Sequence, residues 1–147
     1  MTTGRHIARA GAVTSATAPH WRAELRAGAH HLVADEPAAN GGSDAGPTPF
    51  GLLLSGLAAC TAITLRMYAE RKGWTVAAIE VDVRYDMDDD GQPSIIRTIT
   101  VPTDLPADHR DRLAGIAERT PVTLAVRAGT PITTTLRAND ADAHDGG

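Results

Sequence analysis

The chain has a single cysteine, Cys60, among its 147 residues. One cysteine excludes an internal disulfide and any metal site built from several cysteines, and it is compatible with a reducing compartment. An excess of basic charge is also missing, because the formal net charge is −4 and the basic residues are scattered along the chain. This charge pattern carries no electrostatic footprint for nucleic acid.

The sequence shows no targeting or membrane segment. Its N-terminus, MTTGRHIARAGAVTSATA, lacks the apolar stretch of a secretory signal. The longest uncharged run covers residues 45–65, but its apolar part, residues 50–65, contains Ser55 and Gly56. It is also shorter than the roughly 20 apolar residues that cross a bilayer. We therefore expect a core helix with no membrane partner, in a cytoplasmic protein.

The pattern of apolar residues predicts a single domain over residues 1–147 with flexible ends at 1–18 and 138–147. A strand is predicted at residues 21–26, and the Ala27-Gly28 turn connects it to a second strand. Further strands are predicted at residues 78–87, 94–101 and 131–137. Helices are predicted at 49–72, 105–119 and 120–129. Antiparallel hairpins on either side of one long helix predict an α+β fold, with antiparallel sheets around a long central helix.

The predicted long helix is apolar on every side as far as Arg66. Such a helix must be covered on more than one face, and one sheet of a chain this short cannot easily do that. The small residues Ser55, Gly56, Ala58 and Ala59 would let another backbone approach closely. We therefore expect a homodimer built around this helix.

Cys60 lies about three turns into the predicted helix, beyond the first turn in which the helix dipole acts. Apolar burial raises the pKa of a thiol, so a nucleophilic Cys60 requires a cation from another strand or subunit. The residues alone leave two interpretations open, an inert core cysteine, which they favour, and a reactive thiol. The helix start, with Thr48 as N-cap and Pro49 at N1, has Gly51 where a capping box has Glu or Gln.

Three segments together resemble a known family. They are HLVADEP followed by GG and GPTP, then LLLSGLAACTAITLRMYAERKGW, and finally IAERTPV near the C-terminus. This pattern, from about His30 to Leu136, resembles the OsmC/Ohr family of osmotically inducible and organic hydroperoxide resistance proteins. Within the family it is most similar to the OsmC-like subgroup that carries the ADEP signature.

The resemblance implies an α+β homodimer in which two central helices pack together under sheets exchanged between the subunits. It also implies a function, because catalytic members reduce organic hydroperoxides with two cysteines. Cys60 matches the first, peroxidatic cysteine within AACT, while Thr120 stands at the position of the second. Gly51 stands at the position of the supporting glutamate. The supporting arginine is not mapped uniquely.

Three residues are candidates for the cation that supports Cys60. They are Arg22, Arg26 and His31, the last standing where relatives have arginine in HRLVADEP.

The departures from the family pattern leave three functions open. In the first, Cys60 reduces an organic or lipid hydroperoxide and an external thiol resolves the sulfenic acid. In the second, the dimer has lost catalysis and acts as a small-molecule binding or regulatory module. In the third, the dimer is purely structural and side chains fill its pocket.

Other motifs predict no metal site or cofactor. The segment DMDDDG begins like a calcium loop, but its twelfth position is Arg97 instead of a bidentate glutamate. His30 and His31 would point to opposite faces of a strand, so they cannot chelate one ion together. No phosphate loop, nucleotide fingerprint or Ser-His-Asp arrangement is found. Asp35 and Glu36 belong to the ADEP signature, and the residues alone give them no role.

Overall fold

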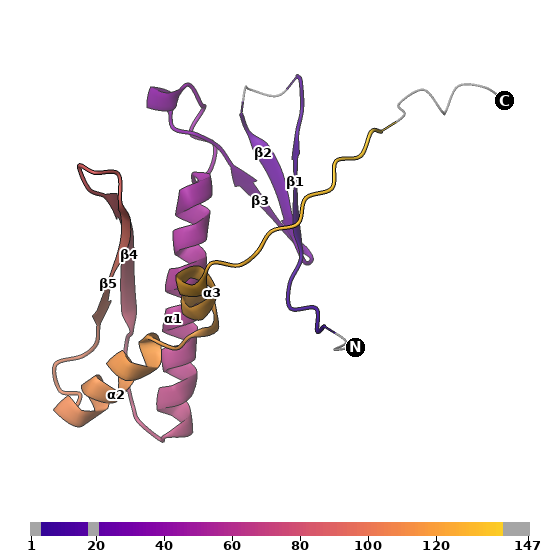
Figure 1. Ribbon diagram of the computed structural model, residues 1–147. Coiled ribbons are helices and arrows are strands. Elements are labelled where there is room, and N and C mark those ends of the chain that lie inside the picture. The colour runs from indigo at the N-terminus through magenta and orange to yellow at the C-terminus, as the bar shows by residue number, and fades with distance from the viewer. Residues whose placement is uncertain (1–3, 18–20, 140–147) are drawn as a thin grey trace.

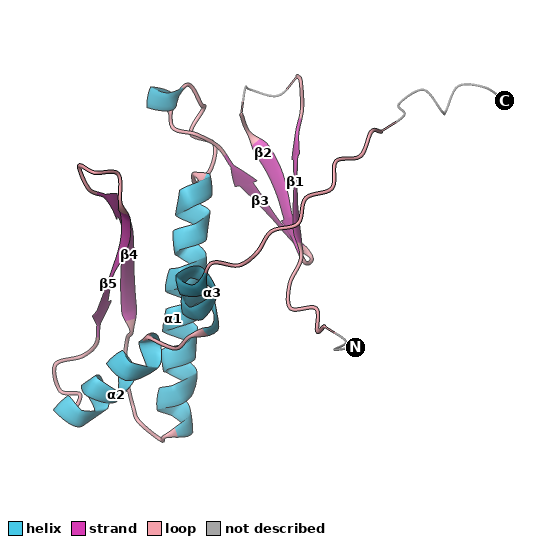
Figure 2. Ribbon diagram, in the orientation of Figure 1, coloured by secondary structure: helices cyan, strands magenta, loops and turns pink. Residues whose placement is uncertain are grey.

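The computed structural model describes residues 4–17 and 21–139. Its central element is helix α1, Pro49–Arg71, which has an antiparallel sheet on either side (Figures 1 and 2). The Thr48 side chain caps the helix by accepting a hydrogen bond from the Gly51 N–H at 3.0 Å, and Pro49 occupies the first turn. Lys72 ends the helix and Gly73 follows in the left-handed region, with φ of 72°. The predicted helix and both of its ends are confirmed.

The first sheet has the order β1-β2-β3, with all neighbours antiparallel. Its strands are β1 (Ala10–Thr14), β2 (Ala23–Ala27) and β3 (His30–Ala34). The second sheet is the antiparallel hairpin of β4 (Glu80–Met87) and β5 (Pro93–Thr100). Helices α2 (Ala107–Ala117) and α3 (Pro121–Ala128) follow it. This arrangement confirms the α+β prediction.

The core lies where α1 packs against β4, α2 and α3. On α1 the buried residues recur every fourth position and form one line: Leu57, Thr61, Leu65 and Ala69. Leu65 and Ala69 then join a cluster that also contains Leu113 and Ala117 of α2. By length and apolar composition α1 could cross a membrane, a test that core helices of soluble proteins also meet.

Two predictions about the ends of the chain are wrong. The segment 1–18 was expected to be flexible, yet Ala10–Thr14 forms β1 by pairing with the free edge of β2. Its sequence, AGAVT, gives no alternation signal because all five residues are exposed. Residues 131–137 are predicted to form a strand, yet they run outward from α3 and pair with no other described segment (Figure 1). Residues 140–147 of the predicted C-terminal end lie outside the described residues.

A second face of α1 remains uncovered in the single chain. Ile63 is 59% exposed and Met67 is 54% exposed. Leu53, Gly56 and Ala59 are exposed on the same side of the helix. We refer to Leu53, Gly56, Ala59, Ile63 and Met67 as the open stripe. Apolar surface of this kind is typical of an interaction face.

The loop before α1 is organised by the buried carboxylate of Asp35. It accepts hydrogen bonds from the backbone N–H groups of Glu36 at 2.8 Å, Ser43 at 3.2 Å and Ala45 at 3.1 Å. Burial alone would raise the pKa of this carboxyl, but the three backbone donors and the positive charge of Arg22 hold it below its ordinary value. Asp35 therefore ties the end of β3 to the loop that begins α1.

Replacing Asp35 by asparagine should lower the melting temperature at pH 7. A carboxylate with a depressed pKa stabilises the fold above its unfolded pKa, and this contribution is lost as the pH falls through the folded pKa. The difference between wild type and Asp35→Asn should therefore shrink below about pH 4. Thermal melts from pH 7 to pH 3 test this, with the exposed loop residue Asp44→Asn as the control. A difference that stays constant with pH would contradict it.

Candidate functional site

Cys60 is half-buried on α1, at the edge of the open stripe. It precedes the buried Thr61 and lies one helical turn before Thr64. In the part of the chain that the structure describes, no hydrogen bond or ion pair reaches its thiol. The thiol is thus not sealed in the core, and no residue among residues 4–17 and 21–139 donates to it or pairs with it.

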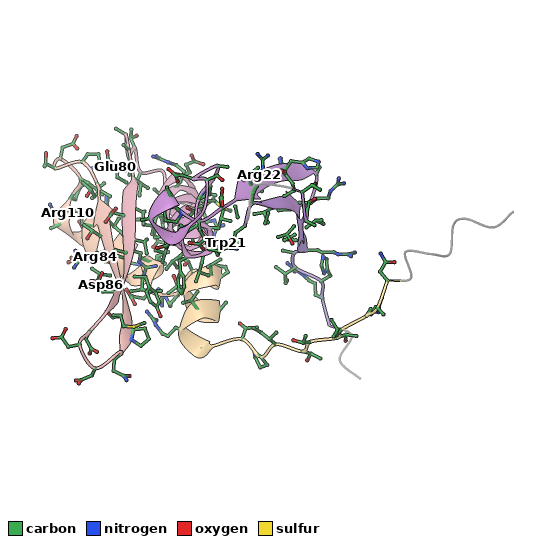
Figure 3. The ribbon with its side chains drawn as sticks, turned by 90° about the horizontal axis from the view of Figure 1, so that it is seen from above. Trp21, Arg22, Glu80, Arg84, Asp86 and Arg110 are labelled. Atoms are coloured by element: carbon green, nitrogen blue, oxygen red, sulfur yellow. The ribbon has the colours of Figure 1, made fainter. Side chains whose placement is uncertain are left out.

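Of the helper residues predicted from the sequence, Arg26 and His31 lie on the three-stranded sheet, and Arg22 directly precedes its strand β2. Arg22 donates from Nε to Glu24 Oε1 at 2.9 Å, and Arg26 of β2 pairs with His31 of β3 across the ladder. Figure 3 shows Arg22 on one side of α1 and Arg84 of the hairpin on the other. The elements that pack on α1 are β4, α2 and α3. The fold therefore makes Arg26 and His31 neighbours on the three-stranded sheet, which is not among the elements that make the main contacts with α1.

Sequence reasoning missed Arg97, whose guanidinium lies between α1, β5 and the junction of α2 with α3. Its NH1 donates to Thr61 Oγ1 at 3.1 Å and to Thr123 Oγ1 at 2.8 Å. Its NH2 donates to the Ala117 carbonyl at 2.9 Å and to Glu118 Oε1 at 3.3 Å. The side chain is only 11% exposed. A signal was present, because Arg97 shares the inward face of β5 with Ile95 and Ile99.

Thr120 is fully buried at the start of α3. Its hydroxyl lies 2.6 Å from Thr123 Oγ1, which in turn accepts from Arg97. Where the resemblance places a second cysteine, the chain therefore has a hydroxyl held within the Arg97 network. At the other departure from the pattern, Gly51, the backbone N–H is used to cap α1.

Glu118 carries the one carboxylate in this network. It pairs with Arg97 and with Arg127, whose NH1 also donates to the Glu118 carbonyl at 3.1 Å. The hydrogen bond from Arg127 is the main cause that lowers the pKa of Glu118, against the opposing effect of partial burial. The glutamate is thus held ionised between two guanidinium groups.

Two cavities flank α3. One, of about 450 Å³, begins one turn after Cys60. It is lined by Thr64, Met67, Tyr68, Arg71, Ile116, Arg119 and Pro121. The other, of about 640 Å³, lies between α1, the β4–β5 hairpin and α3, with Arg97 in its wall. Cys60 lines neither cavity; the first is mostly apolar and is lined from Thr64, one helical turn after the thiol.

Metal ligands do not gather in the described residues, where no three side chains of His, Cys, Asp and Glu are placed to hold an ion. The segment that begins like a calcium loop is a hairpin turn. Asp88 Oδ1 accepts the backbone N–H groups of Asp90 at 3.0 Å and Gln92 at 2.8 Å, and Gly91 has φ of 77°. The carboxylate that a cation would need is engaged by the turn itself.

Residues 41–135 match the family model for OsmC-like proteins. The chain belongs to the OsmC family. The match includes α1 with Cys60, the β4–β5 hairpin and both later helices. No curated protein sequence matches the chain.

Solved structures of the OsmC family share the fold. The OsmC-like protein from Mycoplasma pneumoniae has a TM-score of 0.65 at 19% identity, over 84% of this chain and 89% of that one. The organic hydroperoxide resistance protein OsmC from Legionella pneumophila has a TM-score of 0.60 at 18% identity, over 84% and 91%. The organic hydroperoxide resistance protein OhrB of Bacillus subtilis has a TM-score of 0.57 at 25% identity, over 84% and 93%. The resemblance inferred from the sequence is therefore confirmed at the level of the family and its fold.

Replacing Arg97 by methionine should destabilise the protein by about 3 kcal/mol, because buried acceptors on α1, α2 and α3 lose a charged donor. Urea denaturation of the purified protein measures the change. The matched control is Arg84→Met on the neighbouring strand, where the arginine is exposed and pairs only with Asp86. Its loss should cost no more than about 0.5 kcal/mol. Equal effects of the two substitutions would contradict a structural role for the Arg97 network.

Proposed function

We propose that this OsmC-family protein is a thiol-dependent reductase of organic hydroperoxides that uses Cys60 as its peroxidatic cysteine. One observation carries the proposal: in an OsmC fold, the only thiol of the chain stands half-buried on the central helix, one turn from an apolar cavity. An inert core cysteine would be expected on the buried line of Leu57, Thr61 and Leu65 instead. The apolar cavity suits the organic part of a hydroperoxide.

The chemistry requires one thiol from this chain and two from outside. The Cys60 thiolate attacks a peroxide oxygen, the O–O bond breaks, and the alkoxide leaves and takes up a proton to form the alcohol. Cys60 is then a sulfenic acid. A first external thiol condenses with it and releases water, forming a mixed disulfide. A second external thiolate then attacks the outer sulfur of this bond, which restores Cys60 and releases the external thiols as a disulfide.

The external thiol follows from the composition of the site. Thr120 occupies the place of the resolving cysteine, and its hydroxyl cannot condense with a sulfenic acid to form a disulfide. A small dithiol, a low-molecular-weight thiol or a protein thiol is the class of reductant that the cycle needs. The protein itself needs no metal or cofactor in this scheme.

A homodimer is part of the proposal, because the single chain leaves the site incomplete. The open stripe beside Cys60 is apolar and uncovered. Arg26 and His31 lie on the three-stranded sheet and Arg22 directly precedes it, and this sheet is not among the main contacts of α1. In a pair of chains joined along the open stripe, the sheet of one copy supplies a cation to the thiol of the other. An approaching cation favours the thiolate over the thiol.

A second candidate function is a binding or regulatory module without turnover. One observation favours it: within the described chain Cys60 has no hydrogen-bonding or charged partner, and Gly51 supplies no carboxylate. A purified protein that shows no turnover, with Cys60 slow toward thiol reagents, would support the module.

Replacing Cys60 by serine should abolish peroxidase turnover. With cumene hydroperoxide and a dithiol as reductant, the rate should fall by at least about 100-fold, since the hydroxyl is a far weaker nucleophile than the thiolate. Ala114→Ser, which adds a hydroxyl at an exposed position of α2 outside the open stripe and keeps the thiol, is the control and should retain the wild-type rate. Equal rates for the wild type and Cys60→Ser would exclude the proposed enzyme.

Replacing Ile63 by glutamate should convert the dimer into a monomer, because it buries a charge at the centre of the open stripe. Size-exclusion chromatography with light scattering at micromolar concentration measures the mass. Met87→Glu, at the exposed end of β4, changes the same charge away from α1 and should leave the dimer intact. A wild-type protein of monomeric mass would overturn the dimer.

A further inference from the structure

The cavity of about 640 Å³ between α1, the β4–β5 hairpin and α3 has an unusual excess of hydrogen-bond donors. The peroxidase proposal uses the cavity of about 450 Å³ on the other side of α3, so it leaves this cavity without a role. Two arginines, Arg97 and Arg127, stand in its wall with one carboxylate, Glu118. The charged groups of the wall therefore sum to +1.

Arg97 has one donor that the protein does not use. An arginine carries five N–H groups, and four of them reach Thr61, Thr123, Ala117 and Glu118. The fifth, Nε–H, has no acceptor in the described part of the chain. It is not sealed in the interior either, because every fully buried side-chain nitrogen or oxygen described there has a partner.

The other polar groups of the wall add further unused donors. Arg127 is 56% exposed, and its bonds to Glu118 use two of its five N–H groups. The hydroxyl groups of Tyr85 and Ser94 line the cavity, and no hydrogen bond joins them to other described residues. The wall thus offers donors and positive charge, while its only carboxylate is already engaged.

The rest of the wall is hydrocarbon. Leu57 of α1, Ile95 of β5 and Val126 of α3 contribute apolar side chains to the same cavity. The volume lies within the range of roughly 300–1,000 Å³ that is typical of small-molecule sites. A ligand that satisfies both halves of the wall has an oxygen acceptor with negative charge at one end and an apolar body at the other.

We propose that this cavity binds a monocarboxylate with a hydrocarbon chain of medium length. The carboxylate accepts hydrogen bonds from Arg97 Nε–H and from the free N–H groups of Arg127, and the chain lies against Leu57, Ile95 and Val126. The negative charge of Glu118 opposes that of the ligand and weakens the attraction of both guanidinium groups for it. The site is independent of Cys60 and of the peroxidase proposal.

Calorimetric titration with octanoate tests the site, with octan-1-ol as the neutral probe of similar length. Octanoate should bind at least about tenfold more tightly than octanol, since a charged hydrogen bond exceeds a neutral one. Arg127→Gln should weaken octanoate binding by at least about tenfold. Arg71→Gln, which removes an arginine from the other cavity, is the matched control and should bind octanoate like the wild type.

A variant that is expected to strengthen octanoate binding provides a second test. Glu118→Gln removes the competing carboxylate, so octanoate should bind at least about threefold more tightly, and added salt should weaken the binding in every variant. The proposal is overturned by undetectable octanoate binding, by equal affinity for octanol, or by an Arg127→Gln variant that binds like the wild type. It is also overturned if Arg71→Gln weakens binding as much as Arg127→Gln. No turnover enters the measurement, so an inactive Cys60 leaves its outcome unchanged.

Discussion

The arrangement of the whole chain depends on how the apolar surface of α1 is covered. The chain itself covers one side, where Leu57, Thr61, Leu65 and Ala69 pack beneath β4, α2 and α3. Its remaining elements cannot close over the opposite side, because the three-stranded sheet projects away from the helix (Figure 1). Burial of apolar area is the dominant favourable contribution to folding and to most association. The uncovered side is therefore the face along which the proposed dimer would form.

Arg97 holds the two short helices α2 and α3 against the long helix α1. Helix α3 has eight residues, too few to be stable by itself. A single guanidinium joins its Thr123 to Thr61 of α1 and to the last turn of α2. The position that the family resemblance assigns to a second cysteine, Thr120, belongs to this network. At that position this chain therefore has a structural hydrogen bond between two hydroxyl groups.

Much of the fold could be predicted from the sequence because its long elements carry strong periodic signals. The ends of α1 followed from Thr48, Pro49 and Gly73, and the hairpin followed from strict alternation. Strand β1 could not be predicted, since AGAVT buries nothing and depends only on the free edge of β2. Residues 131–137 were the opposite case, a predicted strand that does not form in the single chain. Their β-branched residues favour a strand, but a strand needs a neighbouring edge that accepts its backbone groups.

The candidate site could be predicted only in part from the sequence. Cys60 stood out by composition, whereas the roles of Arg97 and Asp35 depend on contacts between residues far apart in the chain. Arg97 reaches Thr123 across 26 positions, and Asp35 reaches Ala45 across 10. Single-sequence patterns report faces and turns, and they do not report which buried polar group will meet which partner.

The glycines of the loop before α1 have a mechanical consequence. A Cβ at Gly42 would lie 1.9 Å from the Glu36 carbonyl oxygen, and one at Gly46 would lie 2.2 Å from that of Val33. The backbone there is packed against itself too tightly for any side chain, and Asp35 binds it from within. The loop that connects the three-stranded sheet to α1 is therefore rigid. It fixes the direction of the sheet in the single chain, so formation of the proposed dimer would lose less conformational entropy than it would with a flexible connection.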